Sequence, residues 1–271
     1  MCTTCGCSAT DEITIKKPGE TVSITKNIQL ENHLGHHDHS HDHHHHDHNH
    51  DHHHIEKTII EVEQDILQAN QLLAERNRGY FLGKNIFAIN LVSSPGSGKT
   101  SLLEKTLSDL KSEVDFYVIE GDQQTMNDAD RIDSLKIPVV QINTGKACHL
   151  DSDMVNNAML KLKPAANSIV MIENVGNLVC PSMFDLGENS RVVIISTTEG
   201  DDKPIKYPDM FAGSDICIIN KIDLLPYVNF DVEKAKAYAK QVNPDLEFFE
   251  VSATTGEGMN QWYIWLKSKI S

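Results

Sequence analysis

The feature that most constrains this chain is a glycine-rich segment, Ser94-Pro95-Gly96-Ser97-Gly98-Lys99-Thr100, which directly follows the apolar run 86–92. The run predicts a buried strand, and residues 100–110 predict a helix. In this context, the backbone amides of the loop and the helix N-terminus hold phosphate groups. The strict pattern begins with glycine where this chain has Ser93. We therefore expect residues 94–101, from Ser94 to Ser101, to bind a nucleotide.

Two side chains of this segment have specific expected roles. Lys99 would bridge the β- and γ-phosphates, and the hydroxyl of Thr100 would bind Mg²⁺.

Apolar, β-branched runs recur after the glycine-rich segment and predict further strands. They are residues 116–119, 139–142, 169–172, 192–195, 216–219 and 248–251. Helical patterns at 152–162 and 232–241 separate some of them. Alternating strands and helices predict an α/β fold, a P-loop NTPase with a mainly parallel sheet flanked by helices.

The chain divides by composition at about residue 55. Residues 56–78 have apolar side chains at helical spacing, and Gly79 is the expected end of this leading helix. We expect residues 56–271 to form the nucleotide-binding domain. Residues 1–55 are polar and rich in Cys and His, so we expect a flexible metal-binding arm.

Two later segments point to guanine. Asn220-Lys221-Ile222-Asp223 follows the strand at 216–219, and Ser252-Ala253-Thr254 follows the run at 248–251. The carboxylate of Asp223 can accept from both N1–H and the 2-amino group of guanine, a pair that adenine does not offer. A backbone amide of the Ser-Ala-Thr segment would contact guanine O6. The order of these segments is that of GTPases, so we expect GTP as the substrate.

Acidic residues at two strand ends are candidates for completing the Mg²⁺ site, directly or through water. Asp122 follows the run at 116–119, and Glu173 follows the run at 169–172. Mg²⁺ prefers a few carboxylates together with phosphate oxygens and water. The amide of Gly176 could sense the γ-phosphate. The candidate catalytic residues are Lys99, Thr100, Asp122 and Glu173. No Gln or Arg stands out as catalytic, which is typical of a slow GTPase whose turnover depends on dimerisation or a partner.

Three thiols lie close together at the start of the chain, at Cys2, Cys5 and Cys7. With the terminal amine they would make a compact set of three sulfur donors and one nitrogen donor. Such a set can lie in a plane, which suits Ni(II) or Cu(II) better than tetrahedral zinc. The alternative is a group of solvated thiols.

A histidine-rich segment follows, because all but one of the chain's 15 histidines lie between His33 and His54. Interleaved imidazoles and carboxylates bind several divalent ions weakly, which suits nickel storage. The alternative is a solvated polar linker.

A third candidate metal site consists of Cys148, His149 and Cys180. Three ligands are too few for a closed tetrahedral site. A dimer could share them across its two-fold axis, or water could supply the fourth position. Buried structural cysteines are the alternative, and we expect that role for Cys217.

Composition excludes several classes. A net charge of −15 argues against binding to nucleic acid. No apolar run approaches the roughly 18 residues of a membrane span, and no secretory signal is visible. Because no export signal is visible, we expect a cytoplasmic protein. In the reducing cytosol, clustered thiols are typical of metal ligands.

Taken together, these segments resemble the HypB family, the GTPases that insert nickel into hydrogenase. The resemblance covers essentially the whole chain. It rests on Cys-Thr-Thr-Cys-Gly-Cys, the histidine-rich segment, Ser-Ser-Pro-Gly-Ser-Gly-Lys-Thr, Glu-Gly-Asp-Gln-Gln-Thr, Cys-His-Leu-Asp, Glu-Asn-Val-Gly-Asn-Leu-Val-Cys-Pro and Asn-Lys-Ile-Asp. Ser93 agrees with this family's own form of the phosphate loop.

The resemblance implies a homodimer that works with a HypA-type nickel accessory protein and delivers nickel to the [NiFe]-hydrogenase large subunit. It implies a tight nickel site at Cys2, Cys5 and Cys7. A weaker nickel/zinc site is implied at Cys148, His149 and Cys180. In some bacteria the HypA–HypB pair also serves urease.

Three alternatives remain open. A urease-maturation GTPase should carry a Cys-Pro-His triplet, where this chain has Cys180-Pro181-Ser182. A metal-storage protein would have no use for the guanine-reading segments. A signalling or translational GTPase would not need the Cys and His clusters.

Overall fold

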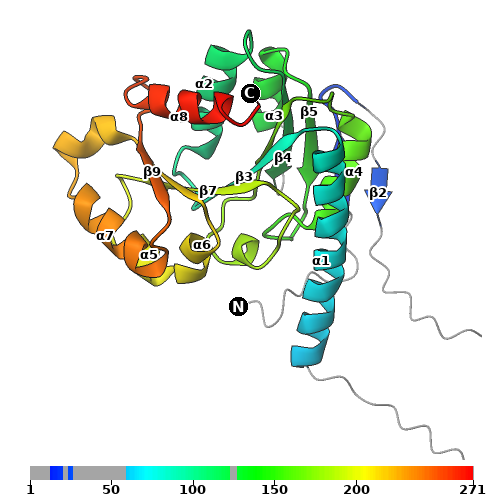
Figure 1. Cartoon of the computed structure of the whole chain (residues 1–271), viewed down its shortest axis with the longest axis horizontal. Coiled ribbons are helices and arrows are strands. Elements are labelled where there is room, and N and C mark those ends of the chain that lie inside the picture. Colours follow the sequence, from blue (N-terminus) through cyan, green and yellow to red (C-terminus); the bar gives the residue numbers. More distant parts are fainter. Residues whose placement is uncertain (1–12, 21–23, 27–58, 123–126, 271) are drawn as a thin grey trace, which may run out of the picture.

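The computed structural model describes residues 13–20, 24–26, 59–122 and 127–270. In this part of the chain one nine-stranded sheet has the strand order β2-β1-β5-β4-β6-β3-β7-β8-β9. Helices cover both faces of the sheet (Figure 1). The strands are β1 (Ile13–Lys16), β2 (Ile24–Lys26), β3 (Phe87–Ser93), β4 (Phe116–Asp122), β5 (Val139–Asn143), β6 (Ile169–Glu173), β7 (Ser190–Ser196), β8 (Ile216–Asn220) and β9 (Glu247–Glu250).

Strands β3 to β9 pair in parallel, whereas β1 pairs antiparallel with both β2 and β5. Each predicted strand is present with ends that differ by at most three residues. The predicted α/β fold with a mainly parallel sheet is therefore confirmed. Since the carboxyl ends of parallel strands share one edge, the loops after β3, β4, β6 and β8 meet there.

The helices connect these strands. They are α1 (Ile59–Gly83), α2 (Lys99–Leu110), α3 (Asn127–Ser134), α4 (Ser152–Leu162), α5 (Lys203–Lys206), α6 (Pro208–Ala212), α7 (Val232–Val242) and α8 (Met259–Lys267), with 3₁₀ turns η1 (Cys180–Ser182) and η2 (Ile222–Tyr227). The central strands are buried on both faces, and their side chains alternate between two cores. Ile89 and Leu91 of β3 join the core under α2, α3 and α8, whereas Ala88 faces α1 and α4.

The leading helix is longer than predicted, because α1 continues through Gly79 to Gly83. Gly79 lies on the exposed face with nothing near it, where a glycine costs only about 1 kcal/mol. The buried side chains of Ala74, Asn77 and Phe81 hold the second half of α1 against the domain. The first half projects beyond the domain (Figure 1).

The segment predicted as an arm contains two strands that the prediction did not include. Ile13 and Ile15 of β1 are buried, and β1 extends the sheet beyond β5. Part of the segment 1–55 therefore belongs to the folded domain, which begins at residue 13 and not at residue 56. Cys2, Cys5, Cys7 and the histidine-rich segment lie outside the described residues, and their metal sites stay predictions.

Among the helices of the described residues, none combines the length and the apolar character that a membrane span requires.

Candidate nucleotide and metal sites

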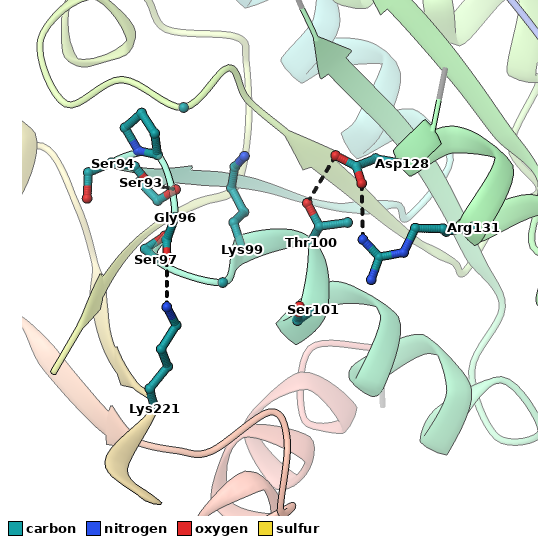
Figure 2. Close-up of a pocket in the computed structure, with 13 residues that line it drawn as sticks. Ser93, Ser94, Gly96, Ser97, Lys99, Thr100, Ser101, Asp128, Arg131 and Lys221 are labelled. Atoms are coloured by element: carbon teal, nitrogen blue, oxygen red, sulfur yellow. Dashed lines mark hydrogen bonds and ion pairs between the residues drawn. The ribbon is translucent and has the colours of Figure 1, made fainter. Parts of the chain in front are cut away.

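The glycine-rich segment wraps around a cavity of about 420 Å³ at the carboxyl edge of the sheet (Figure 2). Two positive backbone angles shape it, φ 77° at Gly96 and φ 89° at Gly98, which favour glycine. The buried hydroxyl of Ser97 has no hydrogen-bond partner among the described residues. Residues lining the cavity are Ser93, Ser94, Pro95, Gly96, Ser97, Gly98, Lys99, Thr100, Ser101, Asp128, Arg131, Gly176 and Lys221.

Asn220 fastens the loop from the neighbouring strand β8. Its amide nitrogen donates to the carbonyl oxygens of Ser97 at 3.0 Å and Gly98 at 3.4 Å. Its amide oxygen accepts from the backbone nitrogen of Ala253 at 3.2 Å. A Cβ on Gly98 would lie only 2.5 Å from the Asn220 amide nitrogen. Asn220 therefore connects two segments that we predicted to bind different parts of the nucleotide.

The rest of the predicted guanine site surrounds this connection. Lys221 has a φ of 62°, and its Nζ donates to the Gly96 carbonyl at 2.7 Å. One carboxylate oxygen of Asp223 is buried without a hydrogen-bond partner in the described part of the chain. Ser252 is fully buried, and its hydroxyl accepts from the Thr255 amide at 3.1 Å, so it shapes its loop. The open acceptor on Asp223 fits the two donors of guanine.

A second cavity of about 480 Å³ adjoins the first, and both are lined by Ser101 and Arg131. Ala253 and Thr254 line only the second cavity. Ala253 and Thr254 thus line a cavity that shares two of its lining residues with the phosphate cavity.

Glu173 holds the two reactive side chains of the phosphate loop. Its Oε1 accepts from Thr100 Oγ1 at 2.6 Å and from Lys99 Nζ at 3.0 Å. The other oxygen, Oε2, is buried without a partner among the described residues. In this state the carboxylate of Glu173 occupies the donors that we expect a nucleotide and its metal ion to use.

Three carboxylates form a candidate Mg²⁺ site, because ligand atoms of Glu120, Asp128 and Glu173 lie within 4.8 Å of one another. Together with the hydroxyl of Thr100, which lies 3.4 Å from Asp128 Oδ2, they form the hard oxygen set that Mg²⁺ prefers. Burial, followed by the charges of Glu173 and Asp122, raises the pKa of Glu120 to about 9. A divalent cation would relieve this crowding of negative charge, so the residues fit the ion.

The structure does not bring Asp122 into this group of three. Strand β4 continues to Asp122, and in its register with β6 it is Glu120 that stands opposite Glu173. The role of Asp122 in Mg²⁺ binding stays a prediction. Glu120 and Asp128 are two further candidate ligands among the described residues.

Asp128 and Arg131 line the phosphate cavity, although no sequence pattern pointed to them. Both lie on α3, the next element of the described chain after β4. Arg131 donates to Asp128 at 3.2 Å and to Glu104 of α2 at 2.5 Å (Figure 2 shows the first contact). The positively charged side chain of Arg131 therefore lines the cavity, although no arginine was predicted to act there.

The structure gathers Cys148, His149 and Cys180 into one cluster with ligand atoms within 4.8 Å. The two sulfur atoms lie 2.6 Å apart, and His149 Nδ1 lies 3.9 Å from the sulfur of Cys148. No fourth Cys, His, Asp or Glu ligand joins this group within the described residues. Cys217, in contrast, is fully buried in β8, and burial raises the pKa of its thiol.

His149 is prepared to act as a neutral ligand. It is buried, and its ring stacks on Phe184 with centroids 3.9 Å apart. Burial lowers its pKa to about 4, so the imidazole is neutral near pH 7 and offers a nitrogen lone pair. Two thiols and a neutral imidazole suit nickel or zinc.

Asn174 connects this cluster to the nucleotide cavity. It directly follows Glu173, and its side-chain oxygen accepts from the backbone amides of Leu150 at 3.1 Å and Val175 at 2.9 Å. Leu150 directly follows His149. The two sites are therefore joined by one buried side chain.

A buried polar chain continues from Asn174 to the other side of the metal cluster. Asn174 donates to Asn90 of β3 at 3.2 Å, and Asn90 donates to Glu188 at 3.0 Å. Glu188 pairs with Arg191, whose guanidinium donates to the carbonyl of Phe184 at 3.0 Å. The chain of contacts thus ends on the residue that stacks on His149.

Comparisons with known proteins agree with this geometry. Residues 87–250 match the family described as CobW/HypB/UreG, nucleotide-binding domain. Hydrogenase maturation factor HypB of Escherichia coli (strain K12) is 55% identical over 214 residues, which cover 79% of this chain and 74% of that protein.

Two solved structures are also similar. HypB from Archaeoglobus fulgidus has a TM-score of 0.71 at 40% identity, covering 75% of this chain and 100% of that one. HypB from Helicobacter pylori in complex with nickel has a TM-score of 0.70 at 38% identity, covering 74% of this chain and 95% of that one.

Proposed function

Because this chain belongs to the HypB family of hydrogenase maturation factors, we propose that it is a GTP-hydrolysing nickel metallochaperone. Its role would be to insert nickel into the large subunit of [NiFe]-hydrogenase. The histidine-rich segment would add nickel storage. A relative with a solved nickel complex supports nickel as the cargo. The Cys148–His149–Cys180 cluster would hold it, with zinc as the alternative ion.

The observation that carries this proposal is the shared segment Glu173-Asn174. Glu173 contacts Lys99 and Thr100 in the nucleotide cavity, and Asn174 contacts Leu150 beside the metal cluster. A change in one site therefore reaches the other through two consecutive residues.

The contacts of Glu173 indicate how the coupling works. Lys99 would turn from the carboxylate of Glu173 to a γ-phosphate when GTP is bound, and the hydroxyl of Thr100 would help to hold Mg²⁺. Glu173 then loses both hydrogen-bond donors and moves with its segment. Asn174 follows and shifts the amide of Leu150, which changes the position of His149 relative to Cys180. Hydrolysis of GTP restores the first arrangement.

The residues in and around the cavity would have different roles in the binding and hydrolysis of GTP. The loop amides and Lys99 hold the phosphates, and Asp223 selects guanine. Thr100, Glu173 and the carboxylates of Glu120, Asp122 and Asp128 are the candidate holders of Mg²⁺, which supplies positive charge to the phosphate oxygens when bound. We propose that turnover is slow and rises when the protein dimerises or meets a HypA-type partner.

The experiment that tests the proposal is a nickel titration of the variant Cys2/Cys5/Cys7→Ala with GDP and with a non-hydrolysable GTP analogue. Nickel–thiolate absorption separates the cluster from the histidine-rich segment, since imidazoles alone do not give this band. We expect one thiolate site whose affinity for nickel differs between the two nucleotides. Reciprocity requires nickel to change nucleotide affinity by the same factor.

Two further variants make the result specific. Cys180→Ser should abolish the band, whereas Cys217→Ala should retain it, because Cys217 lies in β8 outside the cluster. Nickel affinity that is equal with both nucleotides would overturn the coupling. GTP turnover that does not change with protein concentration, with HypA-type protein or with nickel would overturn the regulated GTPase.

A further inference from the structure

The phosphate cavity and the second cavity beside it share two lining residues, Ser101 of α2 and Arg131 of α3. The second cavity continues to Ala253 and Thr254, which belong to the segment predicted to contact the base. In the proposed function the outer phosphates occupy the first cavity, and the nucleoside points toward this segment. The α-phosphate joins these two parts of the nucleotide, so we expect it beside the residues that both cavities share.

The start of α2 gives the same order. Lys99 and Thr100 begin the helix and are expected at the β- and γ-phosphates and their metal ion. Ser101 follows them, and its amide is one of the open donors of a helix N-terminus. In the view of Figure 2, Thr100 is drawn between Lys99 and Arg131. We therefore expect Arg131 to approach the nucleotide from the side away from the γ-phosphate, where the sequence predicted no cationic side chain.

Helix α3 fixes the backbone of Arg131 at this junction. Its neighbours Ala129 and Ile132 are fully buried and belong to the core that also contains the apolar face of α2. The side chain of Arg131, in contrast, is 49% exposed. The helix is thus anchored, while the guanidinium keeps access to the cavity.

Two carboxylates hold the guanidinium of Arg131 in the structure. It donates to Glu104 at 2.5 Å and to Asp128 at 3.2 Å. These contacts use two of the five N–H donors of a guanidinium. Ion pairs between partly exposed side chains contribute little to stability, because water competes for both partners. Arg131 can therefore turn its donors to a phosphate at little cost.

Asp128 has a second expected partner, because it belongs to the candidate Mg²⁺ group with Glu120 and Glu173. One of its oxygens also lies 3.4 Å from the hydroxyl of Thr100. A carboxylate that helps to hold a metal ion attracts the guanidinium less strongly. Occupation of the Mg²⁺ site and release of Arg131 toward a phosphate therefore favour each other.

We propose that Arg131 binds the α-phosphate of the guanine nucleotide. The inference rests on the proposed function and adds a residue to its nucleotide site. A planar guanidinium donates two parallel N–H bonds to the non-bridging oxygens of a phosphate. The α-phosphate is the same in GDP and in GTP, so Arg131 contributes to the affinity for both and not to the rate of hydrolysis.

Calorimetric titration of the full chain with GDP and with a non-hydrolysable GTP analogue tests this role. Arg131→Ala should raise both Kd values by the same factor, about threefold to thirtyfold. Arg131→Lys should recover part of the affinity, because lysine keeps the charge but not the planar fork. In turnover assays of Arg131→Ala, KM for GTP should rise while kcat is unchanged. A loss confined to the GTP analogue would move the contact to the γ-phosphate, and unchanged Kd values would remove it; either overturns the inference.

Phosphorothioate forms of GDP test which phosphate is contacted. In the two isomers with sulfur on the α-phosphate, sulfur replaces one or the other non-bridging oxygen and is a weaker hydrogen-bond acceptor. We expect at least one isomer to bind the unaltered protein less tightly than GDP does. This difference should shrink in Arg131→Ala, which lacks the donor. A difference of the same size in both proteins would overturn the assignment to the α-phosphate.

Arg76→Ala is the control for charge. The protein has a net charge of −15, so the loss of any cation weakens the binding of an anion at long range. Arg76 is an exposed residue of α1 and lines neither cavity. We expect its variant to bind GDP almost as the unaltered protein does, and equal losses in both variants would overturn the inference.

Thermal unfolding without nucleotide separates binding from folding. Both arginine variants should keep the Tm of the unaltered protein, since exposed ion pairs contribute little to stability. A loss of GDP affinity in Arg131→Ala that comes with a lower Tm and is not recovered in Arg131→Lys would mark a structural role and overturn the inference.

The same titrations separate this inference from the proposed function. If the unaltered protein binds no guanine nucleotide, or binds ADP as tightly as GDP, the proposed GTPase itself is wrong. If it selects GDP and Arg131→Ala binds GDP with the same affinity, only the role of Arg131 is wrong.

Discussion

The side-chain amide of Asn220 donates a hydrogen bond of 3.0 Å to the carbonyl oxygen of Ser97, across 123 positions of the sequence. This contact connects the glycine-rich loop to the end of β8, where the segment predicted to read guanine begins. The two halves of the nucleotide site therefore form one rigid unit, and a change at the base end affects the phosphate end.

Asn220→Ala should weaken the binding of guanine nucleotides, whatever number of phosphates they carry. The variant loses two hydrogen bonds to the loop and one to Ala253, and each buried bond that is left open costs about 1–3 kcal/mol. We expect the Kd for GDP and for GMP to rise roughly tenfold to hundredfold. Calorimetric titration checks this, and unchanged affinities would show that the loop holds its shape without Asn220.

Asp223→Asn should instead change the choice of base. Its buried carboxylate oxygen has no partner in the described residues and is suited to the two donors of guanine. Asparagine offers a donor at that place, which suits the C2 carbonyl of xanthine. We expect GDP binding to fall and xanthosine diphosphate binding to rise in a competition assay. Equal losses for both nucleotides would contradict a base-reading role.

Asn174→Ala should uncouple the metal cluster from the nucleotide. The variant leaves the amide of Leu150 without the partner that connects it to Glu173. We expect the nickel affinity of the cluster to become the same with GDP and with a GTP analogue. Asn243→Ala is the control, because the side chain of Asn243 likewise makes two hydrogen bonds to the backbone, in this case as the donor to two carbonyls at 3.1 Å and 2.8 Å beside α6. Coupling that persists in Asn174→Ala would require another connection.

Trp262→Ala should destabilise the fold strongly. Trp262 is fully buried between α8 and α2, and its Nε1 donates to Thr106 at 3.0 Å. Removing such a side chain from a core costs about 3–5 kcal/mol. Equilibrium unfolding in urea measures the loss. Trp265→Ala is the comparison and should cost less, since Trp265 is only partly buried.

Asp185→Ala should lower stability in a pH-dependent way. Although burial opposes it, the Gly187 amide and the Arg78 guanidinium hold the pKa of Asp185 below its usual value. A lowered folded-state pKa stabilises the protein above the unfolded pKa of about 4, and this contribution is lost as the pH falls through the folded-state pKa. Urea unfolding of both proteins should show a constant difference from pH 8 to about pH 5 that narrows below roughly pH 4. A difference that grows on acidification would contradict this sign.

The sequence was most informative where one local pattern decides the structure. Continuous apolar runs located the strands, because strands covered on both faces cannot contain many polar residues. The helix at 152–162 has the predicted bounds, and in the structure Asp151 caps its first turn by accepting from the Met154 amide. The structure also brings Cys148 and Cys180 together, and their role as metal ligands stays a prediction.

The predictions were weaker where tertiary contacts decide. Gly79 does not end α1, because the buried face formed by Ala74, Asn77 and Phe81 continues past it. The short alternation from Ile13 to Lys16 is a strand only because the edge of β5 is available to it. Asp128 and Arg131 line the cavity from the side of helix α3. No motif or spacing in the sequence indicates that this helix lies against the glycine-rich loop.

The chain contains two tryptophans, and both lie on α8 with their rings stacked 5.3 Å apart. Tryptophan fluorescence of the protein therefore comes from a single place. Through Thr106 that place touches the helix that starts in the phosphate loop. A nucleotide that moves α2 changes the surroundings of one indole, so binding can be followed optically without attaching a dye.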